Sequence, residues 1–494
     1  SGLLAVCIGI LVASLGDEAS PIDSVGSSVI ERVPIGVKKW AIDVFGTNDK
    51  TALRVGIWIV LGVVATALGA TRRTRAYAAG VGTFAVLGVA SAAEHPGHGA
   101  LSYAGPVVGG LAGILAFVLL MPWSTRRWFA RVAPGASRVP LGYDRRRFVA
   151  TAGAVSAVAL VAGLLGRRGE RSRVERVEAQ RSSGLPGVED AFERPDTAGF
   201  HPTEPWVTPN ADFYRIDTAM SFPSIDVDTW SFTIDGLVDR PLTLTYADLV
   251  GRPQIERSIT LCCVSNPIGG PFVGNAVWQG VSLADLLDEA GVQSGARQVF
   301  STSVDGWTCG FPVDLALDGR DCLVAIGMNG EPLPLAHGYP ARLVVPGLYG
   351  YVSATKWLSR IELATWERQG FWIPRGWSRL GPVKTQSRID VPRLREDVPA
   401  GRYRIAGVAW AQHTGISRVE VRIDDGPWVE AELGSDVTDD SWRQWVLDWD
   451  ATPGEHRLQV RATDKSGYTQ TDVVQDVAPD GATGWHTRKV RVTG

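Results

Sequence analysis

Two adjacent cysteines, Cys262 and Cys263, are the residues of this sequence with the most distinctive chemistry. They follow a short β-type run at 258–261 and enter a loop rich in Asn, Pro and Gly. A loop after a strand can present side chains for binding, and a cysteine thiolate there is a soft ligand for a metal or cofactor. Free cysteine is also among the most buried residue types. The loop alone therefore predicts that both cysteines are buried core residues. A second motif downstream favours a role as ligand instead.

The second motif is rich in Gly and Pro and carries two cations. Residues 328–334 read Met-Asn-Gly-Glu-Pro-Leu-Pro, and the chain then reaches His337 and Arg342 before a Ser-Ala-Thr-Lys run that ends at Lys356. An Arg guanidinium offers phosphate a planar fork of donors, and a Lys offers a point charge. A structural ion pair for Arg342 and an ordinary structural role for His337 are the alternatives.

Together, the cysteine loop and the second motif resemble the sulfite oxidase family of molybdopterin enzymes, over residues 200–494 and in a membrane-anchored, actinobacterial-type bacterial branch. In that family, the Cys of a Cys-x-x-Asn turn is the protein ligand of molybdenum. Only Cys263 has Asn three residues on, at Asn266, so the resemblance assigns the ligand to Cys263 and makes Cys262 its buried neighbour. The implied fold is a mixed α/β molybdopterin domain followed by an all-β immunoglobulin-like sandwich that serves dimerisation.

The resemblance also implies which residues surround the molybdenum–molybdopterin cofactor. The expected cofactor-binding residues are Asn210, Phe213, Tyr214, Cys263, Ser303, His337, Arg342, Ser353, Ala354, Thr355 and Lys356. Trp307 aligns with the active-site Tyr of the family, and Arg443 is a further candidate for the substrate pocket. Cys263, Trp307 and Arg443 are therefore the catalytic candidates.

Several positions depart from the pattern of the enzymes that oxidise sulfite. Their first pterin-contacting segment contains an Arg-Asn-His run, whereas this chain has Arg215-Ile216-Asp217, and Pro267 and Ile268 stand where they have two Arg. An anion pocket requires cations, so these departures argue against sulfite, and the expected substrate is an unidentified small or peptidyl oxo-compound used in an undetermined redox direction. Sulfoxide reduction is the leading alternative to sulfite oxidation. The alternatives are a sulfite dehydrogenase or oxidase proper and a non-enzymatic membrane scaffold.

Short strands and capped helices are expected to position these residues. Residues 324–326 and 342–345 read as buried strands, and Ser282 reads as the N-cap of a helix. After about residue 385, apolar and charged residues alternate strictly, most clearly at 418–423 and 457–462. Such alternation is typical of strands with one buried face and predicts a sandwich.

The first third of the chain is apolar and predicts a transmembrane region. Its apolar segments are 2–15, 53–70, 76–93, 101–121 and 148–166. Most approach the ~20 residues needed to cross a bilayer, and their number and length argue against buried helices of a soluble protein. Residues 30–45 fit either an interfacial amphipathic helix or an ordinary loop helix. Because the chain starts at Ser1 rather than Met, further membrane sequence is expected before it.

Arginine distribution predicts the orientation of this region. The loops 71–75 and 122–147 are rich in Arg, and 94–98 has no Lys or Arg, which places the first two loops in the cytoplasm. Six Arg between 167 and 181 oppose this orientation. However, Arg145-Arg146-x-Phe148 before the last segment resembles a twin-arginine export signal, which carries folded domains. The alternative is a plain basic anchor. The catalytic domain is thus expected outside a bacterial cell membrane crossed by several helices.

Composition restricts the partners. A net charge of -3 argues against nucleic acid, and the five cysteines include no Cys-x-x-Cys-His haem motif. No haem, flavin or NAD is expected, so electrons are expected to pass to a separate quinone-linked or cytochrome partner. The expected domains are a transmembrane region at 1–168, a linker at 169–205, the molybdopterin domain at 206–380 and the immunoglobulin-like domain at 381–494, which the resemblance allows to form a homodimer.

Overall fold

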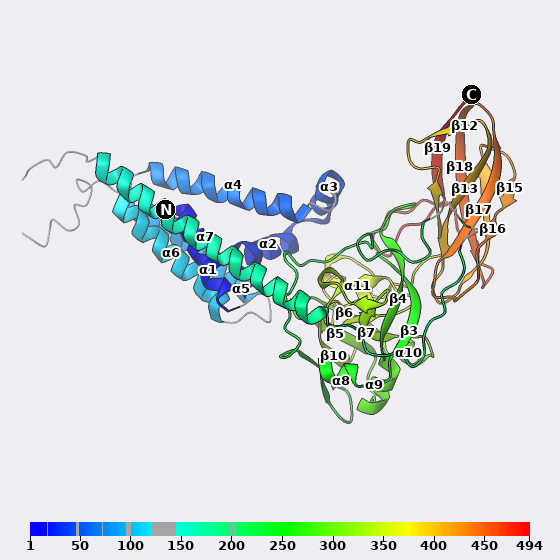
Figure 1. Ribbon diagram of the computed structural model, residues 1–494, viewed down its shortest axis with the longest axis horizontal. Coiled ribbons are helices and arrows are strands. Elements are labelled where there is room, and N and C mark those ends of the chain that lie inside the picture. The colour runs from blue at the N-terminus through cyan, green and yellow to red at the C-terminus, as the bar shows by residue number, and fades with distance from the viewer. Residues whose placement is uncertain are drawn as a thin grey trace, which may run out of the picture. The chain divides into compact units, whose positions relative to one another are not determined.

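The computed structural model describes residues 1–16, 18–45, 49–71, 73–94, 100–120, 145–197, 200 and 204–494. They form two compact units, which Figure 1 shows as a helical part and a largely β part. Unit 1 is Ser1–Glu178 with Asp217–Ser224, and unit 2 is Ala179–Ile216 with Ile225–Gly494.

Unit 1 is built from helices. They are α1 (Gly2–Ser14), α2 (Pro21–Arg32), α3 (Ile35–Phe45), α4 (Asp49–Ala70), α5 (Thr74–Ala93), α6 (Ala100–Leu120) and most of α7 (Arg145–Arg181). Among the described residues, four helices are long and apolar enough to cross a membrane by length and composition, and they lie in α4, α5, α6 and α7. The shorter apolar helix α1 matches the first predicted segment. Four of the five predicted apolar segments are thus helices of spanning length, which favours membrane association.

Close packing of α1 and α6 depends on small residues. A Cβ on Gly109 would lie 2.2 Å from the carbonyl oxygen of Ala5, and one on Gly113 would lie 2.8 Å from the Ala5 Cβ. The absence of side chains at these two positions lets the helix backbones approach, as in many membrane helix pairs.

Two features of unit 1 differ from the sequence-based expectation. Helix α7 is 37 residues long and continues to Arg181, so the segment predicted as a linker begins as a helix. Its polar part contains Arg, Glu, Ala and Gln, which are good helix formers. Helix α2 was not predicted. Its N-cap Ser20 accepts a hydrogen bond from the Asp23 N–H, and Pro21 occupies the first turn, a start signal that the sequence does carry.

The segment Asp217–Ser224 returns to the helices of unit 1. Arg54 in α4 donates to the Met220 carbonyl at 2.9 Å and to the Asp23 carboxylate at 2.9 Å, and Lys50 pairs with Asp217. The chain therefore passes through unit 2 between Ala179 and Ile216 before it comes back to these helices.

The part of unit 2 that precedes residue 381 contains two sheets. The first has the order β2-β1-β10-β5-β6 and is formed by β1 (Ser231–Gly236), β2 (Leu242–Thr245), β5 (Gln298–Ser303), β6 (Thr308–Pro312) and β10 (Leu358–Ala364). The second sheet has the order β3-β4-β7-β8, and β9 also pairs with β7. Its strands are β3 (Ile255–Cys262), β4 (Val273–Ser282), β7 (Leu323–Met328), β8 (Glu331–Pro332) and β9 (Arg342–Val344). Strands β1 and β10 are parallel and the other pairs of these sheets are antiparallel.

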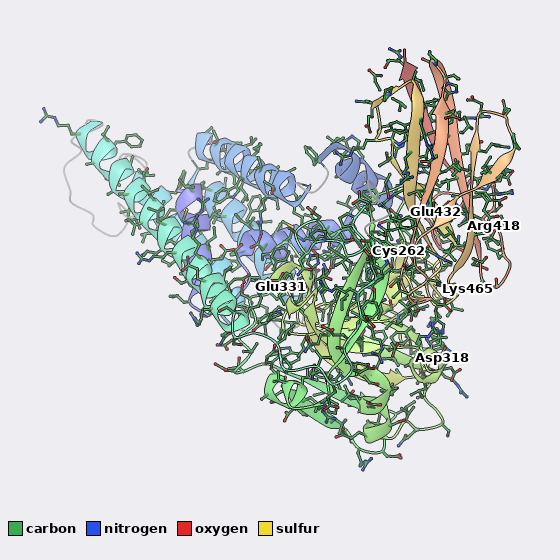
Figure 2. All side chains as sticks on the ribbon, turned by 45° about the vertical axis from the view of Figure 1, so that its right-hand side comes forward. Cys262, Asp318, Glu331, Arg418, Glu432 and Lys465 are labelled. Atoms are coloured by element: carbon green, nitrogen blue, oxygen red, sulfur yellow. The ribbon has the colours of Figure 1, made fainter. Side chains whose placement is uncertain are left out.

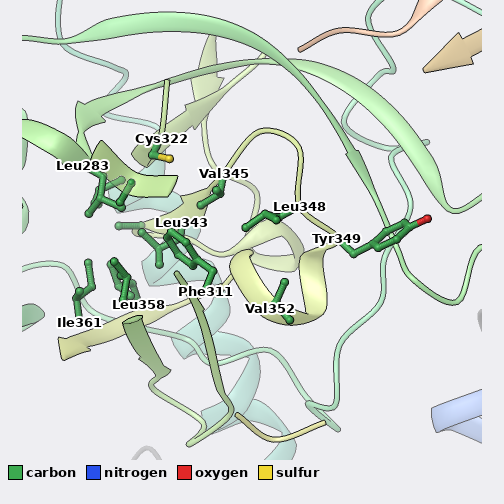
Figure 3. Packing of buried hydrophobic residues seen from close by; sticks show 14 of the residues in the cluster. Leu283, Phe311, Cys322, Leu343, Val345, Leu348, Tyr349, Val352, Leu358 and Ile361 are labelled. Carbon is green, nitrogen blue, oxygen red and sulfur yellow. The ribbon is translucent and has the colours of Figure 1, made fainter. Parts of the chain in front are cut away.

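Short helices accompany these sheets, and one core joins them. The helices are α8 (Tyr246–Val250), α9 (Leu283–Ala290), α10 (Asp314–Leu317), α11 (Gly350–Ser353) and the 3₁₀ helices η5 (Leu335–His337) and η6 (Ile373–Arg375). Ser282 caps α9 by accepting from the Asp285 N–H, as predicted. Figure 3 shows the buried cluster, in which Phe311 from β6 and Ile361 from β10 pack with Leu343 from β9. The mixed α/β expectation is confirmed.

The C-terminal part of unit 2 is an all-β sandwich. One sheet has the order β11-β13-β17-β16 and is formed by β11 (Gln386–Val391), β13 (Gly401–Trp410), β16 (Glu432–Leu433) and β17 (Arg443–Ala451). The other has the order β12-β19-β18-β14-β15 and is formed by β12 (Asp397–Pro399), β14 (Ile416–Ile423), β15 (Trp428–Glu430), β18 (Gly454–Asp464) and β19 (His486–Thr493). Val419, Val421, Leu458 and Val460 are fully buried between the sheets with Trp445, so the predicted alternation is confirmed.

An ion pair at one end of the sandwich predicts a pH dependence of stability. His456 Nδ1 lies 2.8 Å from the Asp424 carboxylate, and its Nε2 lies 2.8 Å from the Thr452 carbonyl oxygen. Both partners are acceptors, so they favour the imidazolium form, and the hydrogen bond to Asp424 raises the pKa of His456 above 6.5. The stabilisation is fully present below pH 6.5 and is lost as the pH rises through the raised pKa.

We expect this pair to contribute about 0.2–1 kcal/mol, as partly exposed ion pairs do. In His456→Gln, the free energy of unfolding measured by urea titration should be lower than wild type at pH 6, and the two should converge above pH 8. An unchanged difference across this range would show that the imidazolium makes no contribution.

Candidate cofactor site

The loop that follows β3 is closed by the side chain of Asn266. Cys263 is the first residue after the strand, and its N–H donates to the Phe272 carbonyl at 2.9 Å. The Asn266 N–H donates to the Cys263 carbonyl at 3.0 Å, and the Asn266 Oδ1 accepts from the Phe272 N–H at 2.8 Å. The Cys-x-x-Asn spacing therefore lets one buried residue, through its backbone N–H and its side-chain oxygen, hold both ends of the loop.

The two cysteines have different surroundings. Cys262, labelled in Figure 2, ends β3 and is 2% exposed within the hydrophobic core. Cys263 is half-buried, and its Sγ lies 3.0 Å from the Ser265 Oγ. Burial raises the pKa of both thiols; the hydrogen bond with Ser265 and the charge of Lys356 partly offset it at Cys263, and the charge of Arg388 and a hydrogen bond with Asn266 do so at Cys262. Exposure therefore distinguishes the two, and Cys263 is the accessible thiol.

Arg342 is a buried cation without a carboxylate partner among the described residues. Its Nη1 donates to the His337 carbonyl at 3.2 Å, and its guanidinium lies over the Trp278 ring at 4.9 Å. Burial lowers the pKa of Arg342 to about 10. A desolvated cation usually has an anionic partner, so this environment is suited to an anionic group of a ligand.

Tyr214 links this cation to the cysteines. Burial, followed by the charges of Cys263 and Cys262, raises the pKa of Tyr214 well above its usual value, and the charge of Arg342 acts in the opposite direction. Tyr214 stacks on Phe213, with ring centroids 5.2 Å apart, and Phe213 meets the Trp278 ring that lies beneath the Arg342 guanidinium.

The segment around Asn210 packs on the second motif. The Asn210 Oδ1 accepts from the Asn329 Nδ2 at 2.7 Å, and the Asn210 carbonyl oxygen lies 3.1 Å from the His337 Nε2. Phe213 meets the rings of Trp278 and His337 edge-on, with centroids 5.8 and 5.5 Å apart. The structure therefore brings Asn210, Phe213, Tyr214, His337 and Arg342 together, although more than a hundred residues separate the two segments.

The turn after α11 lies beside this group. A Cβ on Gly338 (φ 113°) would come within 3.0 Å of the Arg342 Cβ and 3.2 Å of the Lys356 Cα, so the two segments touch there. Lys356 Nζ donates to the Ala336 carbonyl at 3.0 Å. The hydroxyls of Ser353 and Thr355 are fully buried and bond to the Tyr349 carbonyl and the Ser301 hydroxyl. Ala354, between them, is the C-cap residue of α11. A role of these three residues in cofactor binding stays a prediction.

Three further candidates come from the β5–β6 hairpin and the sandwich. The hairpin adjoins the Ser-Ala-Thr-Lys run, since Ser303 pairs with Leu358 and the Val304 N–H donates to the Trp357 carbonyl at 2.8 Å. Ser303 and Trp307 face each other across the β5–β6 hairpin, where the Ser303 N–H donates to the Trp307 carbonyl at 2.8 Å. Arg443 begins β17, and its guanidinium donates to the Gly434 carbonyl at 3.0 Å and to the Ile416 carbonyl at 2.8 Å. The donors of Arg443 are therefore engaged within the sandwich, and its catalytic role stays a prediction.

Sequence reasoning missed Trp278 and Ser265. Trp278 lies in the fully buried strand β4, where a Trp is more often core than site. Ser265 lies in the cysteine loop, two residues after Cys263, and this short spacing is the sequence signal that could have identified it.

Known proteins are similar to this chain in sequence and in structure. Residues 219–372 match the family model of the oxidoreductase molybdopterin binding domain. The chain is 28% identical to human mitochondrial sulfite oxidase over 344 residues, which cover 59% of this chain and 63% of that protein. It is 37% identical over 156 residues to the uncharacterized oxidoreductase YuiH of Bacillus subtilis, which cover 32% of this chain and 76% of that protein. The sulfane dehydrogenase SoxCD from Paracoccus pantotrophus has a similar structure, with a TM-score of 0.52, 25% identity and coverage of 63% of this chain and 89% of that chain.

The fold and the matched domain define a molybdopterin-dependent oxidoreductase. The chain belongs to the sulfite oxidase family, and molybdenum–molybdopterin is its cofactor. It spans less than two thirds of the length of human sulfite oxidase. The residues present fit this group, since the accessible Cys263 thiol and the buried Arg342 cation lie in one site.

Proposed function

We propose that the protein is a membrane-anchored molybdopterin oxidoreductase in which the Cys263 thiolate ligates molybdenum. The observation that carries this proposal is the grouping of an accessible thiol with a buried cation that has no carboxylate among the described residues. When bound, the molybdenum centre supplies two-electron chemistry coupled to oxygen-atom transfer.

The residues of the chain hold and orient this group. The Cys263 sulfur is a soft donor suited to molybdenum, and Ser265 keeps its orientation through the 3.0 Å contact. Arg342 and Lys356 would supply positive charge for the pterin phosphate. Asn210 and Phe213 fix His337 in place for a contact with the pterin.

We infer that the substrate is a neutral oxo-compound such as a sulfoxide. Pro267 and Ile268 stand in the loop where sulfite-oxidising relatives are expected to have cations. Reduction of a sulfoxide consumes two electrons and two protons and releases a thioether and water, so it needs no anion pocket.

Substrate preference is therefore a direct prediction. Loss of one charge-assisted contact to an anion typically costs about 1.5–3 kcal/mol, roughly tenfold or more in affinity. We expect kcat/KM for at least one sulfoxide or N-oxide to exceed that for sulfite, measured on the purified full chain with an artificial electron mediator. Saturation by micromolar sulfite with efficient turnover would return the protein to the sulfite dehydrogenases.

We further infer that electrons pass between this centre and a separate quinone-linked or cytochrome partner. The proposal is supported by the lack of a Cys-x-x-Cys-His motif in the sequence. The helices of spanning length support a multi-pass anchor in the lipid bilayer, and the two-sheet sandwich agrees with an immunoglobulin-like module able to form a homodimer.

Export of the catalytic unit can be tested at the arginine pair. In a variant with both Arg145→Lys and Arg146→Lys, we expect unit 2 to stay in the cytoplasm, loaded with molybdopterin, because a twin-arginine signal needs both arginines. Accessibility to protease added to intact protoplasts measures this. The matched control replaces Arg167 and Arg168, in the same helix α7, by Lys. Equal protease cleavage of wild type and the Arg145/Arg146 variant would rule out this export route.

A further inference from the structure

The outer side of the Cys263 loop is covered by the C-terminal sandwich. Gly269 has φ 69°, and a Cβ there would lie 2.2 Å from the Cδ2 of His486, so the Gly269 backbone rests directly on this ring. The next carbonyl, that of Gly270, accepts a hydrogen bond from the Arg388 Nη1 at 3.1 Å. Two consecutive loop residues are therefore held by β11 and β19.

The groups that hold the loop are themselves fixed within the sandwich. The His486 Nδ1 accepts from the Ile389 N–H at 2.9 Å, which sets the orientation of the ring. The Arg388 side chain is 9% exposed, and its Nε donates to the Asp390 carboxylate at 2.5 Å. Because Arg388 and His486 are both buried and bonded, they offer the loop a rigid surface.

Ile268 adds an apolar contact to the same surface. Its Cδ1 lies 2.7 Å from the position of a Cβ on Gly484, two residues before His486. Ile268, Gly269 and Gly270 therefore each contact the sandwich. Ile268 is one of the two residues that stand where sulfite-oxidising relatives are expected to have cations. Its apolar side chain therefore also packs against the sandwich.

The strand that leads to Cys263 is bound by the sandwich as well. In the described structure, β3 ends its sheet in the order β3-β4-β7-β8, and its outer edge bonds to sandwich residues. The Thr260 N–H donates to the Asp440 carbonyl at 2.9 Å, and the Thr260 carbonyl accepts from the Gln412 Nε2 at 3.0 Å. The Trp442 N–H donates to the Thr260 Oγ1 at 2.7 Å. The chain is thus held just before and just after Cys263.

We propose that Arg388 and His486 are positioning residues for the molybdenum ligand, and we call the two residues the loop clasp. This inference rests on the proposed role of Cys263. Contacts within the loop connect the two clasp residues to Cys263. A Cβ on Gly270 would come within 2.6 Å of the Asn266 Oδ1, and the Asn266 N–H donates to the Cys263 carbonyl. A shift of Gly270 is therefore passed to Asn266 and from there to Cys263.

The clasp has a clear physical purpose. Two consecutive glycines give this loop wide conformational freedom, and a metal ligand must be held close to its productive geometry. Arg388 supplies a charge-assisted hydrogen bond, which is stronger than a neutral one. The sandwich thus completes the scaffold of the cofactor site.

Hydrogen exchange of the cofactor-free full chain tests the clasp without using activity. In Arg388→Met, peptides that cover residues 263–272 should exchange roughly tenfold faster than in wild type, because a buried charge-assisted bond is lost. The matched control is Arg404→Met, in β13 of the same sandwich, where Arg404 is partly exposed and pairs with Asp448. Loop exchange in this control should equal that of wild type.

The loaded enzyme gives a second readout. In Arg388→Met, the Mo(V) electron paramagnetic resonance signal should shift and kcat should fall while KM stays close to wild type. Both features should be unchanged in Arg404→Met. Equal loop exchange in the two variants would refute the clasp.

If Arg388→Met destabilises unit 2 as a whole, the variant Arg388→Lys separates this effect from the loss of the loop clasp, because Lys keeps a cation beside Asp390. If exchange in Arg388→Met rises throughout unit 2, faster exchange confined to 263–272 in Arg388→Lys supports the clasp, and wild-type exchange there refutes it. A wrong assignment of Cys263 as ligand would appear differently. Molybdenum content and spectrum would then be insensitive to Cys263→Ser, whatever the loop exchange shows.

Discussion

Cys263→Ser is expected to abolish oxidoreductase activity and to change the coordination of molybdenum while the fold is retained. Cys263 is half-buried at the end of β3, and the loop around it is held by backbone and Asn266 hydrogen bonds that do not involve its sulfur. A serine hydroxyl is a poor substitute for a soft thiolate. The loss should exceed the about 10- to 100-fold effect of residues one step further from a metal. Activity with a mediator and molybdenum per chain measure it.

Cys262→Ser is the matched control for this variant. Cys262 is 2% exposed among apolar side chains, so a hydroxyl there should reduce stability by about 1–3 kcal/mol. Activity and the molybdenum signal should remain. If Cys262→Ser lost the metal signal and Cys263→Ser kept it, the ligand would be the other cysteine.

Arg342→Met is expected to affect the loaded and the cofactor-free protein in opposite directions. Arg342 is buried over Trp278 and has no carboxylate partner among the described residues. A desolvated cation without an anion is unfavourable, so an apolar side chain of similar volume should leave the cofactor-free chain as stable or more stable. The cofactor should bind at least about tenfold more weakly, because a charge-assisted contact is lost. Thermal unfolding of the cofactor-free chain and pterin content after purification measure the two effects.

Arg360→Met supplies the comparison. Arg360 forms a partly exposed ion pair with Asp235 in β1, and such pairs contribute about 0–1 kcal/mol. Its pterin content should equal that of wild type. Marked destabilisation of the cofactor-free chain by Arg342→Met, with pterin content unchanged, would mean that Arg342 is a structural residue and not an anchor for an anion.

Much of the fold follows from local patterns. Residues 418–423 form a strand in which Val419 and Val421 are buried and the residues between them are not, because one face of a sheet is covered and side chains alternate. Ser282 caps α9 because its hydroxyl satisfies a free N–H of the first turn. The apolar segments are visible because the length of a bilayer-spanning helix is set by the hydrocarbon thickness.

Other features could not be predicted because they depend on contacts between distant residues. The charged part of α7 reads as a linker, yet its residues are good helix formers that extend an existing helix. Arg443 looks like a free cation in the sequence, and only the structure shows the carbonyls of Gly434 and Ile416 beside it.

The candidate site was predicted where a family motif marks it and was missed elsewhere. Cys263, His337 and Arg342 stand in recognisable patterns, and the structure brings the segments that carry them together. Trp278 carries no such pattern, since its position under Arg342 results from the pairing of β4 with β7 and of β7 with β9. The contact between Gly270 and Arg388 joins residues 118 positions apart, and no local rule of sequence anticipates it.

X-ray absorption at the molybdenum edge of the purified full chain tests the central claim most directly. The account predicts that molybdenum in wild type and in Cys262→Ser has one more sulfur neighbour than in Cys263→Ser, at equal metal loading where the variant retains metal. Identical sulfur coordination in wild type and Cys263→Ser, with molybdenum present in both, would contradict it.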